Sequence, residues 1–192
     1  MKILWLDTET TGLYAGTHGL REIGYIIEID GIDVERGVLF IDPRTYNREV
    51  IIDPYALEIS GKTIDCFNHY DDSKFSYDRF LSAIQDNIDV DDKNDRFVIA
   101  GYNVGFDIGF IKDWFKDIGS DSVQFKDLFH YKSLDVFALV FSLRVLGKIG
   151  TENDKLETIC NHFGISIDAH DALSDIVATK QLFEKLNTEF IK

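Results

Sequence analysis

The chain opens with a short apolar run that leads directly into acidic residues, since residues 3–12 read Ile-Leu-Trp-Leu-Asp-Thr-Glu-Thr-Thr-Gly. Four consecutive apolar residues of this kind are typical of a fully buried strand. Residues two apart in a strand point to the same face, so Asp7 and Glu9 are predicted to lie together where the strand ends. An Asp-x-Glu sequence occurs easily by chance among 34 acidic residues, so a solvated or helix-capping role stays open for this pair alone.

Length and composition predict one ordinary globular domain over residues 1–192. Hydrophobic residues make up 45% of the chain and charged residues 28%, which is too apolar for a disordered segment. No apolar run approaches the roughly 20 residues of a membrane span, and the N-terminus lacks the layout of a signal peptide. The two cysteines show no metal-binding spacing. We therefore expect a cytoplasmic protein with reduced thiols and no membrane partner.

The net charge of −14 is the opposite of what a high-affinity duplex binder requires. Taken alone, this charge argues against a nucleic-acid partner. The argument weakens if some of the carboxylates bind divalent cations, because the bound ions then supply the positive charge at the site. The function therefore depends on whether the acidic residues form a metal-binding group.

Strand-like and helix-like segments alternate along the rest of the chain. The apolar periodicity predicts strands over 22–29 and 34–41 joined by an Asp30-Gly31 turn, a surface segment over 42–75 with a short helix near 55–60, a helix near 80–88, a strand over 97–100, a helix over 104–118, a strand over 130–135, and helices over 136–146, 156–163 and 171–186. This order predicts an α/β fold in which a mixed sheet starts with an antiparallel hairpin, continues with parallel strands, and is flanked by helices.

Two further acidic residues occupy helix positions where apolar residues are expected. Asp107 lies one turn before the apolar stripe of the 104–118 helix, and Asp175 lies within the buried face of the 171–186 helix. Neither stripe carries Lys or Arg at a matching spacing. A buried carboxylate usually pairs with a base, caps a helix or binds a metal. A structural role stays open for each residue alone. His170, just before the last helix, is the histidine that lies near one of these acidic residues in sequence, five positions before Asp175.

Three segments of the chain resemble the DEDDh group of the DnaQ-like 3′-to-5′ exonucleases, which includes polymerase proofreading subunits and RNA-trimming enzymes such as ribonuclease T. They are Leu-Asp-Thr-Glu-Thr-Thr-Gly-Leu at 6–13, Gly-Tyr-Asn-Val-Gly-Phe-Asp at 101–107 and Ala-His-Asp-Ala-Leu-Ser-Asp-Ile-Val-Ala-Thr at 169–179. The segment 53–61 is also similar to the family, so the resemblance spans about residues 3 to 186. A sibling group has Tyr where Asp171 stands here, so the His form fits better.

The resemblance implies a ribonuclease-H-like fold and phosphodiester hydrolysis with two divalent cations, Mg²⁺ or Mn²⁺. It implies that Asp7, Glu9 and Asp175 hold one cation, and that Asp7 and Asp107 hold the other. His170 would act as the general base for the attacking water. The resemblance also assigns the terminal nucleotide to residues of two segments, namely Thr10, Thr11, Gly12, Leu13, Asn103 and Phe106.

Several hypotheses about the function remain at this point. The first is an exonuclease that releases 5′-mononucleotides from single-stranded 3′ ends, with DNA slightly favoured over RNA and a role in DNA replication or repair. The alternatives are an exoribonuclease of the same family, a catalytically silent nucleic-acid-binding module, and a ribonuclease-H-like endonuclease. Few residues follow Leu186, so we expect the attachment tail of some proofreading subunits to be missing. This favours a stand-alone enzyme, or one that docks on a DNA polymerase through its surface.

Overall fold

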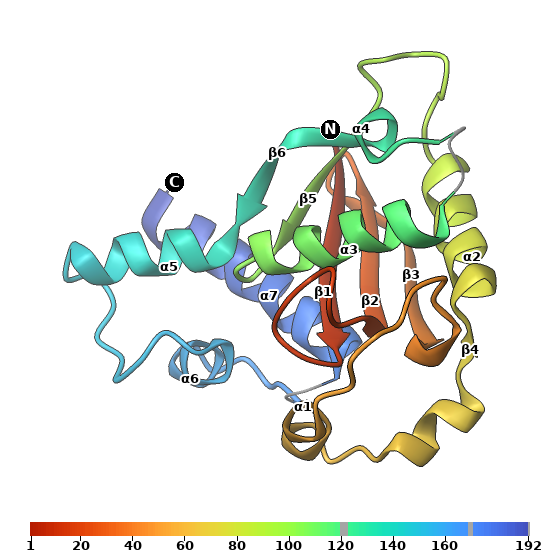
Figure 1. Cartoon of the computed structure of the whole chain (residues 1–192). Coiled ribbons are helices and arrows are strands. Elements are labelled where there is room, and N and C mark those ends of the chain that lie inside the picture. The colour runs from red at the N-terminus through yellow and green to blue at the C-terminus, as the bar shows by residue number, and fades with distance from the viewer. Residues whose placement is uncertain (120–122, 169–170, 192) are drawn as a thin grey trace.

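The computed structural model describes residues 1–119, 123–168 and 171–191. These ranges contain a six-stranded sheet with the order β4-β3-β2-β1-β5-β6 (Figure 1). The strands are β1 Lys2–Thr10, β2 Leu20–Ile29, β3 Ile32–Asp42, β4 Asp71–Asp72, β5 Phe97–Gly101 and β6 Phe129–Asp135. β1, β2 and β3 are antiparallel neighbours, whereas β5 is parallel to both β1 and β6. The predicted mixed sheet with an antiparallel start is confirmed.

Helices cover both faces of this sheet. They are α1 Pro54–Ile59, α2 Ser73–Gln85, α3 Gly105–Ile118, α4 Phe125–Leu128, α5 Val136–Val145, α6 Leu156–His162 and α7 Ala172–Leu186. Shorter turns occur as the 3-10 helices Pro43–Thr45 and Ile64–His69 and as the π-helical turn Asn187–Ile191. Among the described residues, no helix combines the length and the apolar character needed to cross a membrane.

One predicted helix has the wrong bounds. The helix expected near 80–88 is α2, which begins at Ser73 because the Asp72 side chain accepts hydrogen bonds from the backbone N–H groups of Lys74 and Phe75. It ends at Gln85, before the residues 87–88 that we assigned to it. The segment 42–75 also contains β4 and two 3-10 turns that were not predicted. These elements are too short to show a periodic apolar pattern.

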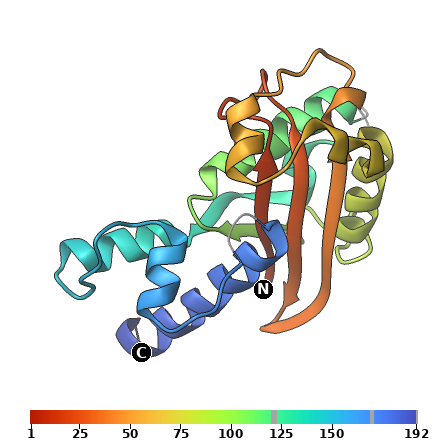
Figure 2. The same cartoon turned by 90° about the horizontal axis from the view of Figure 1, so that it is seen from below.

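The sheet separates two apolar cores. Successive side chains of β1 alternate between them, so that Leu4 and Leu6 pack with α2 and α3, whereas Ile3 and Trp5 pack with α5, α6 and α7. Figures 1 and 2 show α3 and α7 on opposite faces of the strands. The run of residues 3–6 is buried on both sides, as predicted. The acidic residues that follow it in β1 therefore emerge between two packed layers.

Candidate active site

The end of β1 brings three of the predicted metal ligands together. The strand continues through Thr10, so Asp7 and Glu9 share the face of the sheet that α7 covers. Asp175 lies in the first turn of α7. One carboxylate oxygen from each of these three residues lies within 4.8 Å of the others. Carboxylate oxygens are the ligands that hard divalent cations prefer, so this group fits Mg²⁺ or Mn²⁺.

Asp107 approaches β1 from α3 and is only 3% exposed. Its Oδ1 accepts one hydrogen bond from the backbone N–H of Thr8 at 2.9 Å and another from the Thr8 hydroxyl at 2.7 Å. It does not belong to the group of three carboxylates whose oxygens lie within 4.8 Å. The inward position predicted for Asp107 is confirmed. The two hydrogen bonds from Thr8 hold the Asp107 carboxylate next to β1, where Asp7 directly precedes Thr8.

Burial and neighbouring negative charges raise the pKa values of two of these carboxylates, Asp7 and Asp107. Burial raises the pKa of Asp7 well above its ordinary value, and the negative charges of Asp107, Asp175 and Glu9 raise it further. Burial also raises the pKa of Asp107 to about 7, although the hydrogen bonds from Thr8 act in the opposite direction. A bound cation would stabilise the ionised forms of these carboxylates. The raised pKa values therefore agree with a cation site built from carboxylate oxygens.

Sequence reasoning missed two charged residues of β2 at this site. Arg21 is fully buried, and its Nη2 donates to the Oε2 of Glu9 at 2.6 Å. Glu22 is also buried, and its Oε1 accepts a hydrogen bond from the backbone N–H of Ala172 at 3.1 Å. Burial raises the pKa of Glu22, against the lowering effects of the Ala172 N–H and of Arg21. The available signal was an Arg-Glu pair inside the otherwise apolar run of residues 20–27.

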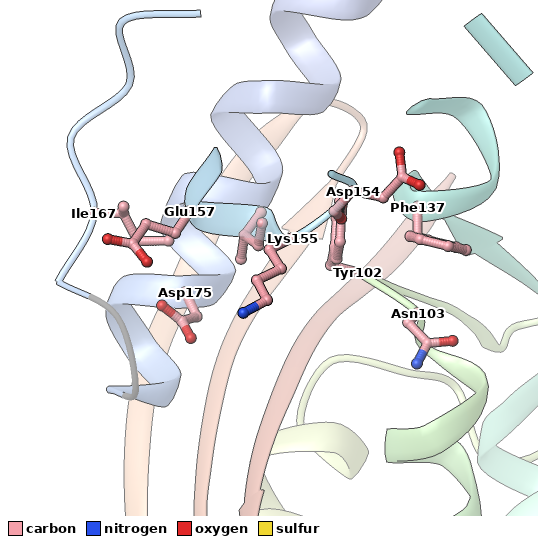
Figure 3. A pocket seen from close by; sticks show the side chains of 9 residues that line it. Tyr102, Asn103, Phe137, Asp154, Lys155, Glu157, Ile167 and Asp175 are labelled. Carbon is pink, nitrogen blue, oxygen red and sulfur yellow. Dashed lines mark hydrogen bonds between the residues drawn. The ribbon is translucent and has the colours of Figure 1, made fainter. Parts of the chain in front are cut away.

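A cavity of about 670 Å³ opens beside Asp175 (Figure 3). Its lining consists of Tyr102, Asn103, Phe137, Asp154, Lys155, Leu156, Glu157, Ile167 and Asp175. The rings of Tyr102 and Phe137 meet edge to face with centroids 5.6 Å apart. In Figure 3 the side chains of Lys155 and Asp175 extend to the same side of the cavity. Aromatic rings and an amine next to Asp175, a carboxylate of the candidate metal group, are suited to a nucleotide.

The predicted nucleotide-binding residues fall into two groups. Asn103 lines the cavity in a left-handed conformation with φ 58°, and its backbone N–H donates to Asp135 at 2.9 Å. Phe106 is half-buried and packs on Phe110. The other group is residues 10–13, and neither these residues nor Phe106 line the cavity.

Residues 10–13 lead from the end of β1 into a loop whose conformation is fixed by hydrogen bonds. Thr11 is buried, and its hydroxyl donates to the carbonyl of Ile51 and accepts from the N–H of Gly19. A Cβ on Gly12 would lie 2.2 Å from the His18 ring, so only glycine fits there. Leu13, in contrast, is 70% exposed. Thr11 and Gly12 therefore hold the loop, and Leu13 is available for contact.

His170 lies outside the described residues, so its predicted role as a base stays a prediction. The helix that follows it has a well-defined start, because the Asp171 side chain accepts a hydrogen bond from the Ser174 N–H at 2.8 Å.

Gly24 determines how closely α7 approaches the sheet, and we expect Gly24→Ala to disturb the site. A Cβ at this position would lie 2.3 Å from the backbone carbon of Ala172, so the first turn of α7, which carries Asp175, must move. Overpacking of this kind costs about 1–3 kcal/mol. Urea denaturation and Mn²⁺ titration should show lower stability and weaker binding. Gly150→Ala is the control, since no atom lies within 4 Å of its Cβ position. Equal Mn²⁺ affinity in both variants would contradict the expectation.

Comparison with known proteins agrees with this geometry. The solved structures that resemble the chain include E. coli Exonuclease I in complex with a dT13 oligonucleotide, with 20% identity and a TM-score of 0.76. That match covers 97% of this chain and 41% of the Exonuclease I chain. The zinc-bound complex of E. coli Exonuclease I with single-stranded DNA has 19% identity and a TM-score of 0.77, and the match covers 100% of this chain and 41% of that one. The chain thus spans about two fifths of those proteins, and the likeness shows the ribonuclease-H-like fold. No curated protein matches in sequence. The model of the RNase_T family, described as "Exonuclease", matches residues 4–183, and the chain therefore belongs to this exonuclease family.

Proposed function

We propose that this protein is a metal-dependent 3′-to-5′ exonuclease of the DEDDh group that acts on single-stranded 3′ ends. The observation that carries the proposal is the meeting of Asp7, Glu9 and Asp175, from two elements far apart in sequence, in a member of an exonuclease family. A catalytically silent binding module would not need a buried Asp7 whose pKa is raised by burial and by the acids around it. The reaction is hydrolysis of the terminal phosphodiester bond, with release of a 5′-mononucleotide.

The four acidic residues have separate tasks in this proposal. Asp7, Glu9 and Asp175 would hold one divalent cation, and Asp7 with Asp107 would hold a second. When bound, two such cations favour ionisation of the attacking water and neutralise charge that develops on the phosphate. Thr8 keeps the Asp107 carboxylate turned toward β1 through its two hydrogen bonds. Because the pKa values of Asp7 and Asp107 are raised, cation binding would release protons.

The remaining tasks fall to residues around the carboxylates. His170 would accept the proton of the attacking water, a role that suits the ordinary pKa of imidazole. Asn103 and Phe106 would contact the terminal nucleotide from the α3 side, and the exposed Leu13 would contact it from the loop. Thr10 donates its hydroxyl to the Gly12 carbonyl at 2.7 Å, so Thr10, Thr11 and Gly12 would serve by presenting Leu13.

The proposal extends to the substrate and the cellular role. DNA is slightly favoured over RNA, because the solved structures that the chain resembles are described with single-stranded DNA or a dT13 oligonucleotide. A role in DNA replication or repair follows from this preference, and a polymerase would dock on the surface. A cytoplasmic location is proposed as well, on the composition of the chain.

The central test compares oligonucleotides labelled at one end. With Mg²⁺ or Mn²⁺, a 5′-labelled single strand should shorten stepwise, whereas a 3′-labelled strand should release labelled mononucleotide at once. EDTA should abolish both results. An internal first cut would identify an endonuclease, and binding without cleavage would identify a silent module. Matched DNA and RNA strands in the same assay distinguish the exodeoxyribonuclease from the exoribonuclease.

Metal removal should also lower the stability of the protein. The clustered carboxylates repel one another without a cation, so ligand linkage predicts a higher melting temperature in Mn²⁺ than in EDTA, by about 2–4 °C for each kcal/mol of binding free energy in a chain of this size. Differential scanning calorimetry measures the difference directly. Equal melting temperatures in the two buffers would contradict a cation site that is formed in the folded protein.

A further inference from the structure

Arg21 occupies an irregular point in the sheet. Glu9 pairs with Glu22 and Thr10 pairs with Leu20, so Arg21 is the additional residue of a β-bulge in β2. In a regular strand, Leu20 and Glu22 would point to the same face. Here Leu20 packs into the core with α2 and α3, whereas Glu22 bonds to the first residue of α7. The bulge turns the Arg21 side chain toward the carboxylates on the α7 face.

The surroundings of the guanidinium are dominated by charge. Its Nη2 lies 2.6 Å from Glu9, its Nη1 lies 3.8 Å from Glu22, and its side chain is inaccessible to solvent. Its Nε and Nη1 have no hydrogen-bond partner among the described residues. Buried arginines that serve only as scaffolding normally have their donors satisfied, because unsatisfied donors cost stability. A residue kept at this cost is better explained by its positive charge than by its hydrogen bonds.

We propose that Arg21 is the built-in counter-charge of the metal site, which stabilises the metal-free protein and thereby weakens its hold on the cation. The inference rests on the proposed function, since it takes Glu9 as a metal ligand. Arg21 offsets one of the negative charges contributed by Asp7, Glu9, Asp107, Asp175 and Glu22. A divalent cation that enters the group meets repulsion from this guanidinium in addition to attraction from the acids. The site therefore exchanges its cation more readily than the same carboxylates would alone.

Charge and geometry make opposite predictions for the removal of Arg21. If the residue acts by its charge, Arg21→Gln should lower the melting temperature in EDTA and tighten Mn²⁺ binding by about tenfold, since a nearby positive charge has been removed. If it acts by holding Glu9 in place as a ligand, the same variant should bind Mn²⁺ more weakly. If it only supports the fold, the affinity should not change. Isothermal titration with Mn²⁺ distinguishes the three, and the second and third results overturn the proposal.

Three further variants complete the test. Arg21→Lys keeps the charge and should return the Mn²⁺ affinity close to that of the wild type. Adding Glu22→Gln to Arg21→Gln removes one charge of each sign and should also restore the wild-type affinity. Lys180→Gln is the matched control, because Lys180 is a buried cation paired with Glu28 at 2.8 Å and with Asp33, away from the acidic group. It should lower the melting temperature and leave Mn²⁺ affinity unchanged.

The test also covers a variant that does not fold and a wild-type protein that does not bind Mn²⁺. If Arg21→Gln does not fold, the comparison between Glu22→Gln and the double variant measures the same removal of Arg21, and the double variant should again bind Mn²⁺ more tightly. Equal affinity in that pair overturns the proposal. If wild-type protein binds no Mn²⁺, the proposed metal site itself fails, whereas normal wild-type binding with no tightening on loss of Arg21 removes only the counter-charge.

Discussion

Asp7→Asn is expected to lower the turnover number on a single-stranded oligonucleotide by about 10³-fold or more. Asp7 is the residue proposed to contact both cations, and its pKa is raised by every other acid of the group. The substitution keeps the shape of the side chain and removes its charge, so the fold is retained while the cations lose their shared ligand. Steady-state kinetics with Mg²⁺ and titration with Mn²⁺ measure the two losses.

Asp78→Asn is the matched control for this substitution. Asp78 lies on the solvent side of α2, where it pairs with Lys74, and its side chain is 55% exposed. Surface pairs of this kind contribute little to stability, so turnover and Mn²⁺ affinity should both stay at wild-type values. The two-cation reading would have to be abandoned if Asp7→Asn turned over substrate at a rate close to that of Asp78→Asn.

His170→Ala is expected to lower the turnover number by about 10²–10⁴-fold while leaving Mn²⁺ affinity nearly unchanged. The reason is that hard cations prefer the oxygens of Asp7, Glu9 and Asp175, which leaves the imidazole free to accept a proton from water. The rate of the wild type should therefore rise with pH through the imidazole range, and this rise should be weaker in the variant. Kinetics over a pH series provides the measurement.

His162→Ala offers the corresponding control, since His162 lies at the exposed end of α6. Its replacement should alter neither the rate nor the shape of the pH profile. Should His170→Ala lose Mn²⁺ binding as fully as Asp175→Ala does, His170 would be a ligand or a structural support, and another group would have to act as the base.

The positions of the acidic residues were predictable because secondary structure imposes simple periods. The period of two in a strand places Asp7 and Glu9 on one face, and the structure confirms this arrangement. The helical period predicts that Asp107 and Asp175 point inward. Asp107 is indeed buried, and Asp175 meets the β1 acids. In the two helices a charged side chain interrupts an apolar pattern, and in β1 the acids follow directly after one, so each signal depends only on local geometry.

The features that escaped prediction depend on long-range register. Arg21 reaches Glu9 because β2 contains a bulge at that point, and neither the hairpin pattern nor the Arg-Glu pair reveals the bulge. Thr8 reaches Asp107 across 99 positions of sequence. Lys155 enters the cavity from a loop that has no periodic pattern. Such contacts follow from how distant elements pack, which a single sequence does not specify.

The docking of α7 on β1 and β2 has a consequence for the order of folding. Glu9 and Asp175 are separated by 166 residues, so the three-carboxylate group exists only after contacts between the two ends of the chain have formed. Contacts between such distant segments close slowly and tend to follow local structure. A ligand that recognises only the finished arrangement acts on the native state and not on the transition state. Mn²⁺ should therefore lower the unfolding rate constant and leave the folding rate constant unchanged.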